Sequence, residues 1–135
     1  MLRISADGKR FASGGADKNV IIWKNTAEGI LKYGHNDSIQ ALSYNPVTLQ
    51  LASVTASDFG IWSPDQKVKI LKNQLPIQRP IYELTVALTF ENLCQSVSKH
   101  KISSKGLCCS WTNDGQLLAI GQFDGTITVR QKDGV

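Results

Sequence analysis

Residues 11–23 read FASGGADKNVIIW, and this stretch decides the fold because the chain repeats it twice in altered form. The second copy is LASVTASDFGIW at residues 51–62, and the third is LAIGQFDGTITVR at residues 118–130. Each copy consists of an apolar strand, a turn of small residues with an aspartate, and a second strand, a pattern that predicts a β-hairpin. A single hairpin cannot bury both of its faces, so we expect several repeats to stack on one another.

Turn signals and short strands surround each copy. The sequences ADGK at residues 6–9, YNPV at 44–47 and WTNDGQ at 111–116 favour chain reversal, because glycine accepts positive φ and proline fixes φ. Residues 39–44 and 106–111 precede two of these turns and alternate in the manner of strands. Short strands, glycine turns and the lack of a long helical period predict an all-β antiparallel fold.

The composition is that of an ordinary folded domain. The chain has 135 residues, of which 41% are hydrophobic and 19% charged. Its first residues do not resemble a secretion signal and no apolar run approaches the roughly 20 residues of a membrane-spanning helix, so we expect a cytoplasmic protein with no transmembrane segment. Three cysteines, two of them adjacent at 108 and 109, match neither a disulfide framework nor a zinc site.

The positive charge belongs to one part of the chain. The formal net charge is +4, yet residues 67–105 hold seven basic and two acidic side chains, so the rest of the chain is close to neutral. Aromatic residues do not interleave with this basic cluster, which argues against a nucleic-acid partner.

The spacing of the repeats resembles that of the WD40 family. Trp62 follows Trp23 by 39 residues, and the pair Gly34 and His35 stands before Trp62 as the Gly-His pair of that family stands before its Trp-Asp pair. The resemblance implies a partial β-propeller of about two to three four-stranded blades. Because propellers need about four to eight blades, such a ring is not closed.

In that family, a polar set of His, Ser or Thr, Asp and Trp joins the strands of each blade by hydrogen bonds. The resemblance assigns this structural set to the second repeat in full and to the other two in part. The full set is His35, Ser53, Asp58 and Trp62; the partial sets are Ser13, Asp17 and Trp23 in the first repeat, and His100 and Asp124 in the third. Ile120 and Arg130 replace the Ser and Trp of the third set, so that set cannot close.

A catalytic reading of these residues is weak. His, Ser and Asp could also form a hydrolase triad, but the chain has no Gly-x-Ser-x-Gly turn, and the repeat already gives these residues a structural role. Glycines 14 and 15 lack the spacing of a phosphate-binding loop. We therefore expect no enzyme activity, no catalytic residue, no cofactor and no metal.

Two irregularities divide the chain. The first repeat begins inside a blade, and 68 residues rather than 39 separate Trp62 from Arg130. We therefore expect WD40 blades at 1–66 with the first one truncated, a basic insert at 67–97 that includes strand-like stretches at 67–72 and 82–90, and a further blade at 98–135. The insert is interpreted as an excursion on the propeller rim, as a docking edge for a partner strand, or as a splice-type insertion.

Several linked segments resemble more closely the amino-terminal propeller of WD-repeat subunits of intraflagellar transport complex A. They include residues 7–23, 28–33, 57–60, 98–101 and 108–115. This resemblance implies a non-catalytic scaffold at the cilium and ciliary base that contacts other complex A subunits and ciliary cargo adaptors, and that supports retrograde transport and cilium assembly. Another WD40 adaptor, such as a ubiquitin-ligase substrate receptor, is the alternative.

Overall fold

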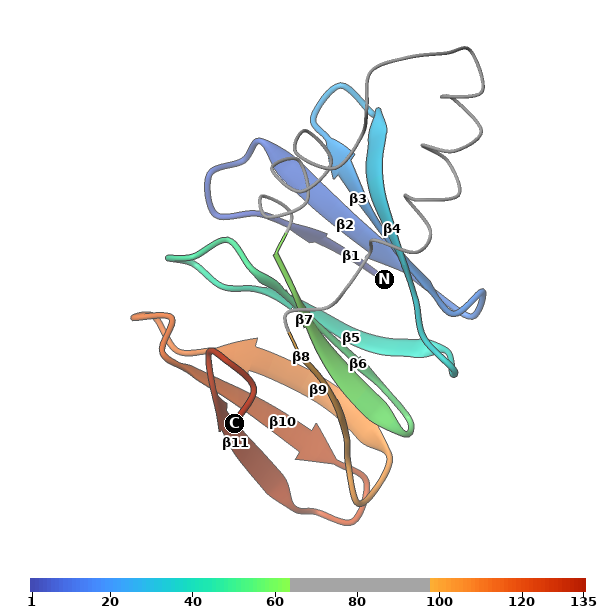
Figure 1. Ribbon diagram of the computed structural model, residues 1–135, viewed down its shortest axis with the longest axis vertical. Coiled ribbons are helices and arrows are strands. Elements are labelled where there is room, and N and C mark those ends of the chain that lie inside the picture. The colour runs from blue at the N-terminus through green and yellow to red at the C-terminus, as the bar shows by residue number, and fades with distance from the viewer. Residues whose placement is uncertain (64–97) are drawn as a thin grey trace, which may run out of the picture.

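The computed structural model describes residues 1–63 and 98–135, which form three antiparallel sheets stacked in a row (Figure 1). The first sheet has the order β1-β2-β3-β4 and the second β5-β6-β7-β8, while the third has the order β11-β10-β9. The strands are β1 Leu2–Ile4, β2 Arg10–Gly14, β3 Asn19–Lys24, β4 Gly29–Gly34, β5 Ile39–Tyr44, β6 Leu51–Thr55, β7 Asp58–Trp62, β8 Ser98–Lys101, β9 Gly106–Trp111, β10 Leu117–Gln122 and β11 Ile127–Gln131.

The first turn of each sheet closes in the same way. The backbone N–H of Ser5 donates to the carbonyl of Arg10 at 2.9 Å, and the N–H of Thr112 donates to the carbonyl of Leu117 at 2.9 Å. In the second sheet Asn45 makes the equivalent bond to Gln50 at 2.7 Å. The three turn signals of the sequence thus produce three hairpins of the same construction.

Two apolar layers hold the stack together, one on each side of the second sheet. The first layer lies between the first and second sheets and is formed by Ala12, Val20, Ile22, Leu31, Tyr33, Ile39, Leu42, Leu51 and Trp62. The second layer lies between the second and third sheets and is formed by Ala41, Ala52, Val54, Phe59, Ile61, Trp111, Leu118 and Ile120. Every residue of β6 and β7 is buried, because alternate side chains of these strands enter opposite layers.

Polar bonds at one end of the stack join the second sheet to the third. The side chain of Asn45 is fully buried, and its Nδ2 donates to the carbonyl of Gly115 at 2.8 Å. Close to this turn, Trp111 Nε1 donates to the carbonyl of Ser43 at 3.2 Å. Gly115 has a φ of +69° and lies against the Asn45 amide, so a side chain at this position would meet both strain and a neighbour.

The predicted all-β antiparallel fold is confirmed, and the three sheets of the described residues do not close into a ring. The first sheet, predicted to be truncated, has four strands, of which β1 is three residues long and exposed. The strands predicted at 67–72 and 82–90 lie outside the described residues. Within the described ranges, no helix is long and apolar enough to span a bilayer.

Candidate functional site

The structure brings the four residues of the second polar set into one hydrogen-bonded chain. His35 Nδ1 lies 2.7 Å from Asp58 Oδ1, and His35 Nε2 lies 2.7 Å from Ser53 Oγ. Trp62 Nε1 donates to the same Ser53 hydroxyl at 2.5 Å. The set therefore joins side chains that are up to 27 residues apart in the sequence, since it runs from His35 to Trp62.

Each member of this set is held by regular structure. His35 follows β4 of the first sheet, and its backbone N–H donates to the carbonyl of Lys18 at 2.9 Å. Ser53 lies on β6, and Asp58 and Trp62 lie at the two ends of β7 in the second sheet. The His35 side chain consequently bonds the end of one sheet to the middle of the next.

One arrangement of protons satisfies these donors and acceptors with a neutral imidazole. Trp62 Nε1 can only donate, so Ser53 Oγ accepts from it. When the Nδ1–H of a neutral His35 donates to Asp58 Oδ1, the unprotonated Nε2 accepts from the Ser53 hydroxyl.

Electrostatics favour the same protonation state. Burial is the main cause that lowers the pKa of His35 below its ordinary value of 6.5, and it outweighs the opposing hydrogen bond and charge of Asp58. Burial raises the pKa of Asp58, but hydrogen bonds from Thr55 and His35 overcome that effect and lower the pKa below 3.8. A neutral His35 beside an ionised Asp58 is therefore the stable state near neutral pH.

Aromatic rings enclose the set. Tyr33 of β4 stacks on Trp62 with ring centroids 4.2 Å apart, and His35 meets the same indole edge to face at 5.4 Å. Tyr33 and Trp62 are only 1% and 2% exposed, so water has little access to the bonds between them. Exclusion of water strengthens hydrogen bonds in such a site and makes an unpaired group there costly.

The first repeat forms part of an equivalent set. Trp23 Nε1 donates to Ser13 Oγ at 2.9 Å, as Trp62 does to Ser53. Asp17 is exposed in the β2–β3 turn, where it accepts from Asn19 rather than from a histidine. The pairing of strands places Asn19, not Asp17, at the position that Asp58 holds in the second sheet.

Within the described residues, no hydrogen bond joins His100 to Asp124, the two members of the predicted third set. His100 belongs to β8 of the second sheet, where it pairs with Phe59 and stacks on its ring at 5.3 Å. Asp124 is exposed and accepts from Thr126. Ile102 occupies the position of His35, because its backbone N–H donates to Ser57 in the same way that His35 donates to Lys18.

Two further polar residues, Thr55 and Gln122, organise these turns and were not among the predicted site residues. Thr55 Oγ1 donates to Asp58 Oδ1 at 2.8 Å and so adds a fifth member to the second set. In the third sheet Gln122 is 5% exposed; its Oε1 accepts from Ser104, and its Nε2 donates to Thr126 and Thr128. Both follow the Leu-Ala stretch of their repeat by the same number of positions, which is the signal that could have identified them.

The chemistry of the set is structural. Ser53 is fully buried, and its hydroxyl is already used as a donor and as an acceptor, so it has no access to a substrate. Within residues 1–63 and 98–135, no three His, Cys, Asp or Glu side chains are grouped to hold a metal ion.

Cys108 and Cys109 are free thiols, and burial raises the pKa of Cys109 to about 12.

Known proteins share both the sequence and the fold. The family model described as "WD domain, G-beta repeat" matches residues 2–24 and 92–130. The chain is 56% identical over 128 residues to the "Intraflagellar transport protein 122 homolog" of Xenopus tropicalis, and equally to that of Homo sapiens. Each match covers 95% of this chain but only 8% of the relative, so the chain corresponds to a small part of those proteins.

A solved structure extends the likeness to the arrangement of sheets. The β-propeller domain of Cps50 (Swd1) from Myceliophteria thermophila superimposes with a TM-score of 0.69 over 96% of this chain and 34% of its own, at 16% sequence identity. That likeness concerns the fold alone. The repeat family is non-catalytic, in agreement with the prediction that the chain is not an enzyme. The chain thus has a partial β-propeller fold, contains two segments that match the WD40 repeat model, and is homologous to a segment of the intraflagellar transport protein 122 homologs.

Proposed function

We propose that the chain is a non-catalytic scaffold of intraflagellar transport complex A, which works at the cilium and ciliary base through protein–protein contacts. The observation that carries this proposal is the 56% identity over 95% of the chain to the intraflagellar transport protein 122 homologs. Its partners would be other complex A subunits and ciliary cargo adaptors, and its role would be to support retrograde transport and cilium assembly.

The geometry supports a scaffold because it fixes the positions of the loops. Two apolar layers and the His35 set leave the three sheets little freedom to move relative to one another. Loops that connect such sheets are exposed and are held in defined places, which suits them to the recognition of a partner. Recognition by a preorganised surface loses less entropy on binding than recognition by a mobile one.

The proposal is tested by affinity capture from ciliated cells that express the tagged 135-residue chain. We expect complex A subunits to co-purify with it, and the tagged chain to concentrate at the ciliary base. A chain without residues 68–95 serves as the comparison, because it separates the contribution of the insert from that of the sheets. Capture of ubiquitin-ligase subunits in place of complex A, or no capture by a chain shown to be folded, contradicts the proposal.

A further inference from the structure

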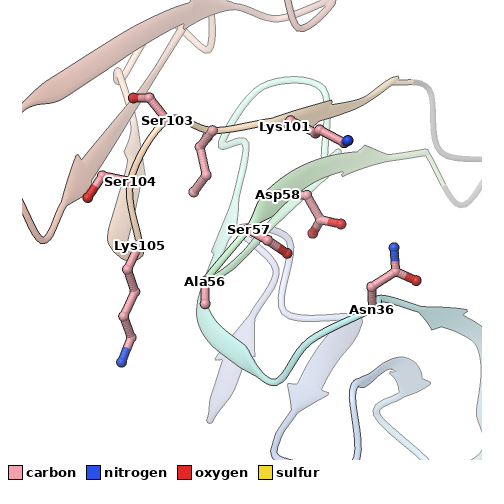
Figure 2. A pocket seen from close by; sticks show the side chains of 9 residues that line it. Asn36, Ala56, Ser57, Asp58, Lys101, Ser103, Ser104 and Lys105 are labelled. Carbon is pink, nitrogen blue, oxygen red and sulfur yellow. The ribbon is translucent and has the colours of Figure 1, made fainter.

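A cavity of about 430 Å³ opens at one end of the second sheet, among loops that include its links to the first and third sheets (Figure 2). Its walls come from the β4–β5 loop, the β6–β7 turn, the end of β8 and the β8–β9 loop. The residues that line it are Asn36, Ala56, Ser57, Asp58, Lys101, Ile102, Ser103, Ser104 and Lys105. The cavity lies beside the His35 set and shares Asp58 with it, but its other lining residues have no part in that set.

The donors around this cavity are free to bind a ligand. Among the residues that the structure describes, the side chains of Asn36, Ser57, Lys101 and Lys105 make no hydrogen bond or ion pair. Figure 2 shows Asn36, Asp58 and Lys101 around one open space, while Lys105 lies on the other side of the view, next to Ser104, and points away from that space. Unpaired ammonium, amide and hydroxyl groups grouped in this way can all donate to an anionic oxygen.

The charge of the rim is positive. Lys99 and Lys101 lie on the same face of β8, and Lys99 Nζ is 3.5 Å from Asp58 Oδ2. Asp58 is the only carboxylate that lines the cavity, and its Oδ1 is already occupied by His35 and Thr55. The positive charges of the lysines on β8 and the β8–β9 loop therefore outnumber the single negative charge of Asp58.

Part of the cavity lining is apolar. Ile102, which is half-buried, and Ala56, on the β6–β7 turn, both line the cavity. A ligand that fits the apolar and the charged parts of this lining needs a short aliphatic stem that carries an anionic group, a description that matches the side chain of glutamate or aspartate. Carboxylates that bind lysines and neutral donors at a half-exposed site gain specificity from charge complementarity.

We propose that this cavity binds acidic side chains from an extended peptide segment of a protein partner. A carboxylate of the partner lies beside Lys101 and accepts from Asn36 and Ser57, while its stem packs on Ile102. The inference concerns the surface of this chain and does not require that the partner belong to complex A, so the two proposals fail separately.

The test uses the complete 135-residue chain, labelled with ¹⁵N, and nuclear magnetic resonance. The probe is an extended peptide of seven residues with three glutamates, and its control has glutamines in their place. We expect the acidic peptide to shift the amide signals of Ser57, Ser103 and Lys105 until they saturate, with the glutamine peptide about tenfold weaker, as expected for one lost charge interaction of ordinary strength.

Variants of the lysines that line the cavity show whether the acidic peptide binds there. The double variant Lys101→Ala with Lys105→Ala should weaken the acidic peptide about tenfold or more. Lys132→Ala removes an exposed positive charge at the far end of the third sheet, after β11, and should leave the binding unchanged. Unchanged indole signals in each variant show that the sheets are intact.

Three results would overturn the proposal. The first is equal binding of the acidic and glutamine peptides, and the second is an equal effect of Lys132→Ala and the double variant. The third is saturation of the same signals by inorganic phosphate at a concentration no higher than that of the peptide, because the cavity would then be a general anion site rather than a site for acidic peptide.

Discussion

His35 and Trp62 meet edge to face, with ring centroids 5.4 Å apart and ring planes at 87°, and both bond to the single hydroxyl of Ser53. Since His35 follows the last strand of the first sheet and Trp62 ends the third strand of the second, this contact fastens two sheets to each other. The same indole also stacks on Tyr33, so the polar and apolar parts of the interface depend on one side chain.

Removal of the His35 ring should lower the free energy of unfolding strongly. The variant His35→Ala removes one hydrogen-bond partner from the Asp58 carboxylate, which keeps Thr55, and one from the buried Ser53 hydroxyl, which keeps Trp62. Because both bonds are lost in a buried site, we expect the free energy of unfolding to fall by about 3 kcal/mol. His100→Ala is the matched control, because His100 is half-buried and its Nε2 has no hydrogen-bond partner within the described part of the chain. Its cost should be about 1 kcal/mol, mainly from the lost ring contact with Phe59. Urea titration followed by circular dichroism measures both, and equal costs would refute a special role for His35.

Two serines that each accept a hydrogen bond from a tryptophan indole should contribute differently to stability. Ser13 is half-buried, and its hydroxyl accepts one hydrogen bond, from Trp23 Nε1. Ser53 is fully buried, and its hydroxyl is hydrogen-bonded to both Trp62 and His35. We expect Ser53→Ala to cost about 2 kcal/mol and Ser13→Ala about 1 kcal/mol or less. Chemical denaturation of the two variants under one set of conditions gives the comparison, and a larger loss for Ser13→Ala would contradict it.

Two glycines with the same backbone conformation should also differ in how much stability is lost when alanine replaces them. Gly8 and Gly115 occupy equivalent hairpin turns, with φ of +67° and +69°. A methyl group on Gly8 would have no neighbour within 4 Å, whereas one on Gly115 would meet the Asn45 amide. We expect Gly8→Ala to cost about 1 kcal/mol and Gly115→Ala more than about 2 kcal/mol, because only the second adds a clash to the backbone strain. Thermal unfolding of both variants measures the difference, and equal melting temperatures would show that the Asn45 contact contributes nothing.

Stability should fall in acid through two groups of this set. The pKa of His35 is lowered in the folded protein, so below about pH 6.5 the unfolded chain binds the proton more readily and the free energy of unfolding decreases. The pKa of Asp58 is also lowered, so its contribution is present above about pH 3.8 and is lost as the pH falls below that value. Urea midpoints measured from pH 8 to pH 3 test both signs. The first decrease should be absent in His35→Ala, and a wild-type chain that becomes more stable between pH 7 and pH 5 would contradict the assignment.

The strands were the predictable part of this fold. Alternation and turn residues gave strands at 39–44 and 106–111, and these are the bounds of β5 and β9. The third repeat lacks the Gly-His pair, so its sequence gives no direct signal for the residue equivalent to His35. His35 stands four residues before β5, and the residue four positions before β9 is Ile102. That spacing is the sequence signal that identifies Ile102.

The contacts between repeats could not be predicted from the sequence. Asn45 reads as an ordinary turn residue, yet its amide bonds to Gly115, which is 70 residues away. The cavity at Lys101 likewise combines loops of different sheets, and no local pattern marks Asn36 as its neighbour. Such contacts depend on how the sheets stack, which is set by the shapes of buried side chains and not by periodicity.

The central claim is that neighbouring sheets stabilise one another and present their loops as one scaffold. Each sheet contains one tryptophan whose indole N–H is hydrogen-bonded: Trp23 to Ser13, Trp62 to Ser53, and Trp111 to the carbonyl of Ser43. The most direct measurement follows these three indole signals by ¹⁵N nuclear magnetic resonance as urea is added to the unmodified chain. We predict that all three native signals disappear at the same urea concentration. Loss of the Trp23 signal at a clearly lower concentration than that of Trp62 would contradict the claim, because the first two sheets would then unfold independently.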